Sequence, residues 1–460
     1  MDLKYEKKDA IEFIKSKKDM DEYIERYIDF LNYAKTEYRA AKFAENMLKE
    51  NGFVDINSKK KLKTGDKVYF VNNEKSIYAA IIGKDDLKDG LNIVGAHIDS
   101  PRLDLKPMPL YEKHHAGLLK TQYYGGIKKY QWTTIPLAMY GVIYNEDGKK
   151  IEIEVGEGEN DPCFTITDLL PHLAREQMKL GANEFIDPEK LVVLVGSLKS
   201  DDKETEKVKN SVKRNILKLL NKKYGIKEID FARSEISLVP AFRARYVGFD
   251  YSLVGGYGQD DRSCAYASLE ALCKQKGLNQ KTAVIMLVDK EEIGSVGNTS
   301  MSSNIFDLFI TKLIKLKGEE DTSILEVYYN SKMLSADVST LVDPSYDEVS
   351  DIQNGNILGC GIALEKYTGS GGKYSASDAN AKYVSEVMQI FEKNNIAFQL
   401  GTLGKIEKGG GGTIAYILAE KGVNVIDCGP GVLCMHSPFE ITSSSDLYMT
   451  TKAYDAFLRA

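Results

Sequence analysis

Short apolar runs alternate with helical patterns along most of this 460-residue chain. The runs are rich in Val, Ile and Leu, and they predict strands at residues 77–82, 92–97, 191–198, 283–288, 398–403 and 424–428. Apolar periodicity predicts helices at about 20–49, 263–276, 305–317 and 379–394. This alternation is typical of a layered α/β domain with a largely parallel or mixed sheet.

The bulk composition narrows the class of protein. Hydrophobic residues make up 43% of the chain and charged residues 28%, as in an ordinary globular protein. The net charge of -6 argues against a nucleic-acid partner, which would require a basic face. No run approaches 18 apolar residues, so a membrane span is not expected. Without a signal-like start or any C-x-x-C pair, the six cysteines predict reduced thiols in a cytoplasmic protein.

The α/β rhythm is interrupted between residues 103 and 245. This stretch holds Tyr123-Tyr124-Gly125-Gly126, a strand-like segment at 151–155 and a lysine-rich segment at 199–223. Acidic residues alternate with lysines in the last segment, which predicts a solvated helix or a mobile loop. We therefore expect a discontinuous metal-binding catalytic domain, 1–102 and 246–460, into which a β-rich domain, 103–245, is inserted.

His97 and Asp99 are the strongest indication of chemistry. They follow the apolar run 91–96, and their spacing puts both side chains on one face of an extended chain. There the histidine can bind a metal while the carboxylate orients it. An isolated histidine at a strand end is more often structural, so the hypothesis that His97 binds a metal also depends on the motifs that follow in the sequence.

The pair Asp260-Asp261 stands directly before a helical run. Capping of that helix would by itself explain both acids. The alternative is that one aspartate bridges two cations with its two oxygens, held rigidly by the helix start.

Glu291 and Glu292 end the apolar strand 283–288 and precede Ile293-Gly294. Adjacent carboxylates on extended backbone point in different directions, so one can bind a metal while the other approaches the metal-bound water. The second carboxylate can then act as a general base. The carboxyl ends of strands are where α/β proteins build their sites.

Asp337 and His436 complete a candidate set of metal ligands. Asp337 lies in a small-residue context, where a turn is as good an explanation as a ligand, and His436 follows Gly429-Pro430-Gly431. Two neutral histidines and three carboxylates (Asp260, Glu292 and Asp337) around two divalent cations leave a net charge of about +1, which one hydroxide neutralises. The parts are those of a two-metal hydrolase.

In this order, the motifs resemble those of the M18 metallopeptidases, the aspartyl aminopeptidase family within the co-catalytic zinc exopeptidases. The matching motifs are H-x-D-S-P at 97–101, the Asp pair at 260–261, D-x-E-E-I-G-S at 289–295, S-A-D at 335–337 and M-H-S at 435–437. The resemblance covers nearly the whole chain.

The resemblance implies a role for each residue of the set. One zinc would be held by His97, Asp260 and Asp337, and the other by Asp260, Glu292 and His436. Glu291 would be the general base that acts on the metal-bound water, and Asp99 the carboxylate behind His97. The resemblance also implies peptide substrates, an inserted domain that mediates dimerisation, and assembly into dodecamers.

Two departures from the family pattern concern substrate handling. After S-A-D, better-known members continue A-H-A-x-H-P-N, whereas this chain continues Val338-Ser339-Thr340. The family's substrate-contacting histidine is shifted here within Pro171-His172-Leu173-Ala174, where His172 is the candidate replacement. Lys373 is a second candidate substrate contact, although a solvated loop lysine is the commoner case. The preferred N-terminal residue, acidic or neutral, therefore stays open.

Other functions are compatible with parts of the pattern. An amide deacylase could use the same two-metal site, and a catalytically silent assembly protein could keep the metals alone. The glycine cluster 409–412 lacks the G-x-x-x-x-G-K-[ST] spacing of a phosphate loop, which disfavours a nucleotide enzyme. The expected metal is Zn²⁺, with Co²⁺ or Mn²⁺ as alternatives, because the ligand set has no cysteine. His114-His115 has no assigned role.

Overall fold

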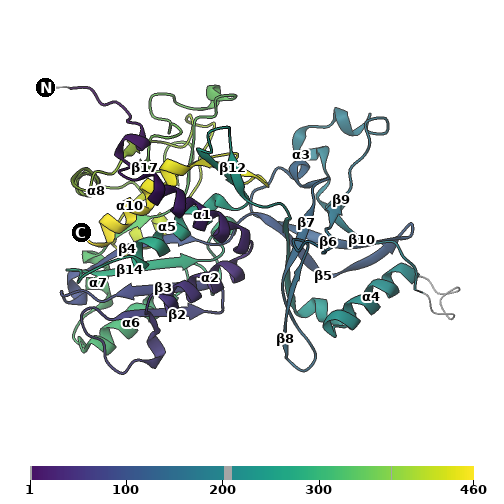
Figure 1. The fold of residues 1–460 in the computed structure, drawn as a ribbon, viewed down its shortest axis with the longest axis horizontal. Coiled ribbons are helices and arrows are strands. Elements are labelled where there is room, and N and C mark those ends of the chain that lie inside the picture. Colours follow the sequence, from purple (N-terminus) through teal and green to yellow (C-terminus); the bar gives the residue numbers. More distant parts are fainter. Residues whose placement is uncertain (1–2, 201–209, 375) are drawn as a thin grey trace. The chain divides into compact units, whose positions relative to one another are not determined.

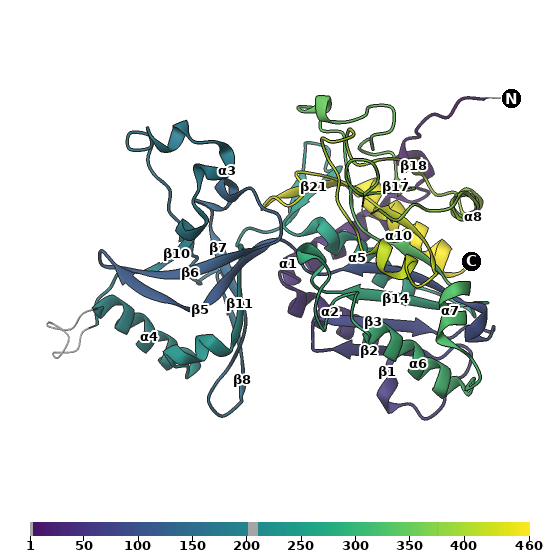
Figure 2. The same cartoon turned by 180° about the vertical axis from the view of Figure 1, so that it is seen from behind.

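The fold is built from two separately packed units (Figures 1 and 2). The computed structural model describes residues 3–200, 210–374 and 376–460. Unit 1 comprises Met1–Asp99, Ala244–Met435 and Phe439–Ala460, and unit 2 comprises Ser100–Arg243 and His436–Pro438. That residues 103–245 act as a dimerisation domain stays a prediction.

A nine-stranded mixed sheet forms the centre of unit 1. In spatial order its strands are β1 (Val54–Asp55), β2 (Lys67–Asn72), β3 (Ser76–Ile81), β14 (Thr282–Val288), β4 (Leu91–His97), β15 (Lys332–Ser335), β19 (Asn424–Gly429), β17 (Ile362–Glu365) and β18 (Phe398–Leu400). The four central strands, β14, β4, β15 and β19, are mutually parallel. Their side chains are buried on both faces, which explains the continuous apolar runs in the sequence. The predicted α/β class with a mixed sheet is confirmed.

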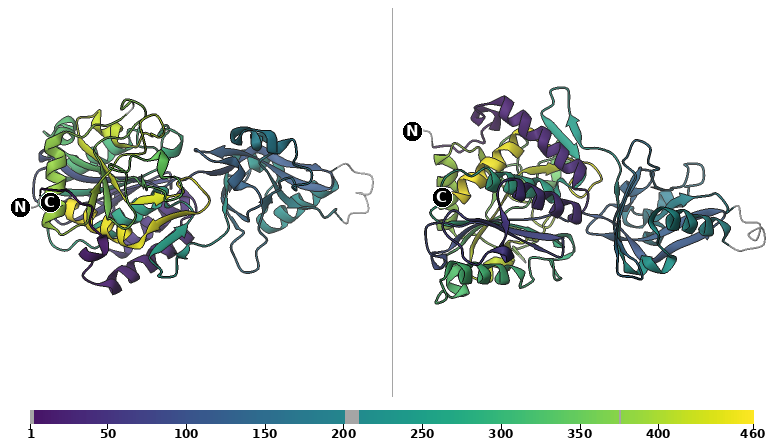
Figure 3. Two further views of the ribbon diagram at one scale, coloured as in Figure 1. Left: turned by 90° about the horizontal axis from the view of Figure 1, so that it is seen from above. Right: turned by 60° about the horizontal axis from the view of Figure 1, so that its bottom comes forward.

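Helices cover both faces of this sheet (Figure 3). On one face lie α1 (Lys17–Tyr33), α2 (Glu37–Glu50), α5 (Gln259–Cys273), α8 (Ala381–Lys393) and α10 (Ser444–Leu458). On the other lie α6 (Ile305–Lys317), α7 (Ile324–Asn330) and α9 (Ala415–Ala419). Alternate residues of each central strand enter opposite cores, as Val94 and Ile93 of β4 do.

Unit 1 also contains a smaller sheet, and unit 2 is built on a third. The smaller sheet has the order β12 (Arg245–Val247), β13 (Leu253–Gly256), β21 (Glu440–Ser443), β20 (Gly431–Leu433) and β16 (Ser339–Thr340). The sheet of unit 2 has the order β8 (Lys150–Val155), β7 (Leu137–Tyr144), β11 (Ser234–Pro240), β5 (Arg102–Lys113), β6 (Ala116–Tyr124), β10 (Val192–Gly196) and β9 (Thr165–Ile166). All its pairings are antiparallel. Two helices, α3 (Ala182–Phe185) and α4 (Ser211–Tyr224), accompany it.

The single helix predicted at about 20–49 is wrong, because the chain breaks between α1 and α2. At the break, two carbonyl groups accept hydrogen bonds from arginine side chains, one nearby and one distant in the sequence. Tyr33 O accepts from Nε of Arg39 at 2.6 Å, and Lys35 O accepts from Nη2 of Arg262 at 3.3 Å. The apolar periodicity continues through the break because both helices bury the same kind of face.

One further expectation, the buried central strand at 191–198, needs correction. The run at 191–198 forms β10 of the antiparallel sheet in unit 2, where most of its residues are only half-buried. The lysine-rich segment contains α4, the helix of the two alternatives expected, in which only Val212 and Ile216 are buried; its residues 201–209 lie outside the described residues. None of the helices formed by the described residues has the length and apolarity to cross a membrane.

Asp446 ties the start of α10 to the loop before β17. Its buried carboxylate accepts N–H groups from Gly359 at 2.8 Å and Gly361 at 2.7 Å. Burial raises the pKa of Asp446 to about 7, although the two N–H donors pull the pKa down.

Asp446→Asn should lower the free energy of unfolding by roughly 1–3 kcal/mol, because an amide NH₂ group would face a backbone N–H. The raised pKa means that ionisation of Asp446 costs stability, and this cost grows as the pH rises from about 4 to about 7. The difference between wild type and variant should therefore narrow from pH 5 to pH 8 in urea unfolding. A difference that widens over this range would contradict the assignment.

Candidate metal centre

Parallel pairing brings the predicted motifs to one edge of the sheet of unit 1. His97 ends β4 and pairs with Val288 of β14, so the segment after β14 starts beside His97. On the other side of β4, Ser335 of β15 pairs with Gly95, which places Asp337 two residues beyond the same edge. The carboxyl ends of three strands thus deliver acids and a histidine to one place. Asp260 and Asp261, in the first turn of α5, reach it from the sequence that follows the insertion.

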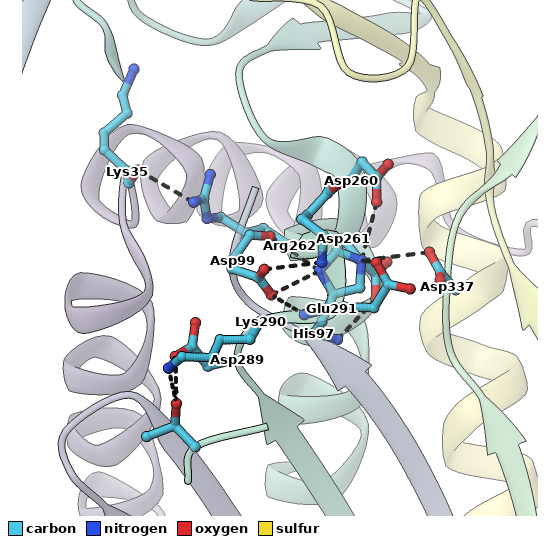
Figure 4. A network of polar contacts seen from close by, with 12 residues as sticks. Lys35, His97, Asp99, Asp260, Asp261, Arg262, Asp289, Lys290, Glu291 and Asp337 are labelled. Carbon is cyan, nitrogen blue, oxygen red and sulfur yellow. Dashed lines mark hydrogen bonds and ion pairs between the residues drawn. The ribbon is translucent and has the colours of Figure 1, made fainter. Parts of the chain in front are cut away.

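Carboxylates surround the imidazole of His97 (Figure 4). Nε2 of His97 lies 3.3 Å from Oδ1 of Asp260, 3.7 Å from Oδ1 of Asp337 and 3.8 Å from Oε2 of Glu291. The histidine is 1% exposed, and its Nε2 makes no hydrogen bond with any described residue. A buried ring nitrogen facing several carboxylate oxygens is a donor set suited to a cation.

Asp99 contacts both the ring of His97 and the backbone of the glutamate pair. Its Oδ1 lies 3.4 Å from Nδ1 of His97, and its backbone oxygen lies 3.1 Å from the same nitrogen. Its two carboxylate oxygens also accept the backbone N–H groups of Glu291 at 3.1 Å and Glu292 at 3.2 Å. One buried carboxylate therefore orients the histidine and fixes the pair of glutamates.

The two glutamates begin a one-turn 3₁₀ helix, Glu291–Ile293, and do not lie on the extended backbone expected from the sequence. Lys290 precedes them in the left-handed conformation, with φ of 69°. Its Nζ lies 2.8 Å from Oδ2 of Asp289, which also accepts a hydrogen bond from Oγ1 of Thr299 at 2.6 Å. These contacts of Asp289 stabilise the turn in which the backbone N–H groups of both glutamates face Asp99.

Crowding of buried acids changes their protonation. Burial raises the pKa of Glu291 to about 8, and Asp337 and Asp260 add to the rise while His97 opposes it. Burial also raises the pKa of Asp337 and of Asp261. Burial lowers the pKa of His97, but its carboxylate neighbours outweigh this effect and leave the pKa well above the usual value. The site attracts positive charge, as a metal centre must.

Among the residues that the structure describes, two groups of side chains could each hold a metal ion. One is His97 with Asp260 and Glu292, and the other is His97 with Asp261 and Asp337. Within each group the ligand atoms lie within 4.8 Å of one another. The residues thus fit a cation. Asp261 was not among the ligands expected from the sequence, because the family resemblance assigned the bridging role to Asp260 alone.

The remaining predicted site residues lie outside these two groups. His436 belongs to unit 2, where its Nδ1 is 2.8 Å from the backbone oxygen of Gly126. His172 is exposed in a turn of the same unit. Lys373 of unit 1 is exposed, and its Nζ lies 2.7 Å from Oδ2 of Asp378. Their roles stay predictions. The pair His114-His115 forms the exposed turn between β5 and β6.

Comparisons with known proteins agree with this architecture. The model of the family described as Aminopeptidase I zinc metalloprotease (M18) matches residues 30–458. A protein of Borrelia garinii, described as a probable M18 family aminopeptidase 1, is 48% identical over 439 residues, which are 95% of each chain.

Two crystal structures have the same fold. An M18 family aminopeptidase from Thermotoga maritima has a TM-score of 0.95 at 44% identity, over 99% of this chain and 100% of that one. Aminopeptidase I from Clostridium acetobutylicum has a TM-score of 0.93 at 44% identity, over 100% of each chain. The fold and the similarities define the class as metallopeptidases. This chain belongs to the M18 family of aminopeptidases.

Asp99→Asn should weaken metal binding about 10–100-fold and lower activity, because it disturbs both the histidine and the glutamate turn. An amide in place of the carboxylate would turn an NH₂ group towards a backbone N–H. Metal affinity is measured by competition with a chelator, alongside hydrolysis of a peptide substrate.

Asp161→Asn is the matched control for Asp99→Asn. Asp161 also accepts two backbone N–H groups, from Gly156 at 3.2 Å and Gly158 at 3.1 Å, but it lies in unit 2 and on the surface. The control should bind metal as the wild type does. Equal behaviour of the two variants would show that Asp99 has no special part in the site.

Proposed function

We propose that this chain is a two-metal aminopeptidase that hydrolyses the N-terminal peptide bond of peptides. The observation that carries the proposal is the convergence of carboxylates on one buried histidine, whose Nε2 lies within 3.8 Å of Asp260, Asp337 and Glu291. So many buried acids in one place are unfavourable without a cation to offset their charge. Membership of an aminopeptidase family supplies the reaction class.

The proposed ligands are His97, Asp260 and Asp337 for one ion, and Asp260, Glu292 and His436 for the other. Asp261 is a further candidate, since it shares a group with His97 and Asp337. Zinc is the expected metal from the family description, with Co²⁺ and Mn²⁺ as alternatives. When bound, the cations polarise the scissile carbonyl and lower the pKa of the attacking water.

Glu291 is the proposed general base. Its carboxylate faces the same histidine but belongs to neither group of candidate ligands, which leaves its oxygens available for proton transfer. It would take a proton from the attacking water and return it to the leaving nitrogen. Burial raises the pKa of Glu291 to about 8, and a bound cation would lower this pKa, so that the carboxylate is ionised and able to accept a proton near neutral pH. Asp99 would hold the turn that begins at Glu291, so that the Glu291 carboxylate keeps its orientation towards the attacking water.

Substrate contacts, assembly and location complete the proposal. His172 and Lys373 are the proposed substrate contacts, and the preferred N-terminal residue of the substrate is acidic or neutral.

A structure described as a dodecamer of S. cerevisiae mApe1 shares the fold with a TM-score of 0.76 at 21% identity. We propose self-association for this chain too, as a dimer and a dodecamer. A cytoplasmic location is consistent with its six free cysteines.

Glu291→Gln should lower kcat about 10²–10⁴-fold while both metals stay bound, because the amide cannot accept the proton. Turnover is measured on an aminoacyl chromogenic substrate, and metal content by elemental analysis. Glu420→Gln, an exposed acid that follows α9, is the control and should retain activity. Full turnover by Glu291→Gln would remove Glu291 from the mechanism.

Metal-stripped protein should be inactive and should regain activity with Zn²⁺, Co²⁺ or Mn²⁺. The substrates are aminoacyl chromogenic compounds with acidic, basic and apolar residues, so the best one also identifies the preferred N-terminal residue. Failure of every metal to restore turnover would favour a deacylase or a silent assembly protein over the aminopeptidase.

A further inference from the structure

Unit 2 contains an apolar cavity that the proposed aminopeptidase activity does not use. It holds about 210 Å³ and is lined by residues of the seven-stranded sheet, of the loop before β9, of α4 and of the segments that follow α4. Every lining residue except Lys223 and Tyr224 has an apolar side chain. The cavity lies wholly within one unit, so its walls are defined by that unit alone.

The cavity lies beside α4, which packs closely on the sheet near its start. Near its start, Val212 and Ile216 are buried, and a Cβ atom on Gly117 of β6 would lie 2.1 Å from Cδ1 of Ile216. Towards its end, Leu219 is 59% exposed although it also lines the cavity. Figure 2 shows α4 running along the sheet of unit 2. The lining residues of α4 run from Ile216 to Tyr224, so the cavity extends along the second half of the helix.

The sheet side of the cavity is walled by strand residues that point to one face. Met139 and Ile143 of β7 flank Gly141, which presents no side chain, and Ile153 and Ile236 stand on the neighbouring strands. Such a wall gives water no hydrogen-bond partner, and an apolar cavity of about 150 Å³ is large enough to bind benzene. A volume of about 210 Å³ thus accommodates a ring with a small substituent.

Among the described lining residues, Tyr224 has the one polar side chain that is not exposed. Its hydroxyl is buried and makes no hydrogen bond with any of the described residues. A buried hydroxyl left in this state is unfavourable, and an occupant with a hydrogen-bonding atom would relieve the cost. The neighbouring cation does not do so, since Nζ of Lys223 lies 5.1 Å from the ring centre of Tyr224 and its side chain is exposed.

We propose that this cavity is a binding site for a small uncharged aryl molecule that carries one hydrogen-bonding group, the chemical class of phenol. The ring fills the apolar space between α4 and the sheet, and its polar atom pairs with the Tyr224 hydroxyl. The wall is too apolar for a charged group, whose desolvation no described lining residue deeper than Lys223 would offset.

The test compares phenol with benzene on the full-length chain by isothermal titration calorimetry. Wild type should bind both, and phenol more tightly. Tyr224→Phe keeps the shape of the wall and removes the hydroxyl, so phenol binding should weaken about threefold to tenfold while benzene binding is unchanged. Equal weakening of both ligands, or of neither, would overturn the role of Tyr224.

Val155→Phe tests the location of the site. The larger ring is introduced at the end of β8 and occupies the cavity, so both ligands should lose binding. A crystal structure of wild type soaked with bromobenzene provides a second measurement that does not depend on how the variant folds. Anomalous density between α4 and the sheet would support the proposal. It would be overturned by absence of density, by a segment of a second copy filling the cavity, or by unchanged binding in folded Val155→Phe.

Discussion

The parallel pairing of β4 with β14 and β15 is the constraint on which the rest of the site depends. Because paired residues in parallel strands advance together, His97 lies beside Val288, and Ser335 lies beside Gly95, so that Asp337 follows two residues further on, towards the level of His97. The acids that follow β14 and β15 then have little distance to cover before they reach the histidine. A slip of one residue in either pairing would turn the strand's inward side chains to the opposite core and separate the acids from His97.

The site concentrates like charge that a folded chain ordinarily avoids. Asp260, Asp261, Glu291 and Asp337 crowd around a single imidazole, and burial raises the pKa of three of these four acids. Hydrogen bonds from backbone N–H groups offset part of the cost, as the two donated to Asp99 do. The electrostatic repulsion that remains among the carboxylates favours cation binding, since a bound cation would remove it.

Most of the strands and helices that the sequence predicted are present in the structure, and the failures have a common cause. The buried runs of β14 and β19 and the periodic helices α6 and α8 lie within two residues of where local pattern put them. The helix predicted at 20–49 is wrong because the carbonyls of Tyr33 and Lys35 accept hydrogen bonds from arginines, one of them more than 200 positions away in the chain. Likewise β10 has the composition of a central strand but is only half-buried in the antiparallel sheet of unit 2. Periodicity reports which face is apolar, and it carries no information about distant partners.

The sequence by itself determined the chemistry-bearing motifs, their order and the α/β class, because strand and helix periods and the H-x-D and Glu-Glu spacings are local properties. Only the tertiary structure decided which carboxylates face His97, that Asp261 joins the candidate ligands, and that Asp99 holds the glutamate turn through backbone N–H groups. It alone also left a cavity beside α4. These features depend on contacts between residues tens to hundreds of positions apart, and the geometry of such contacts exists only once the strands have paired and the helices have packed.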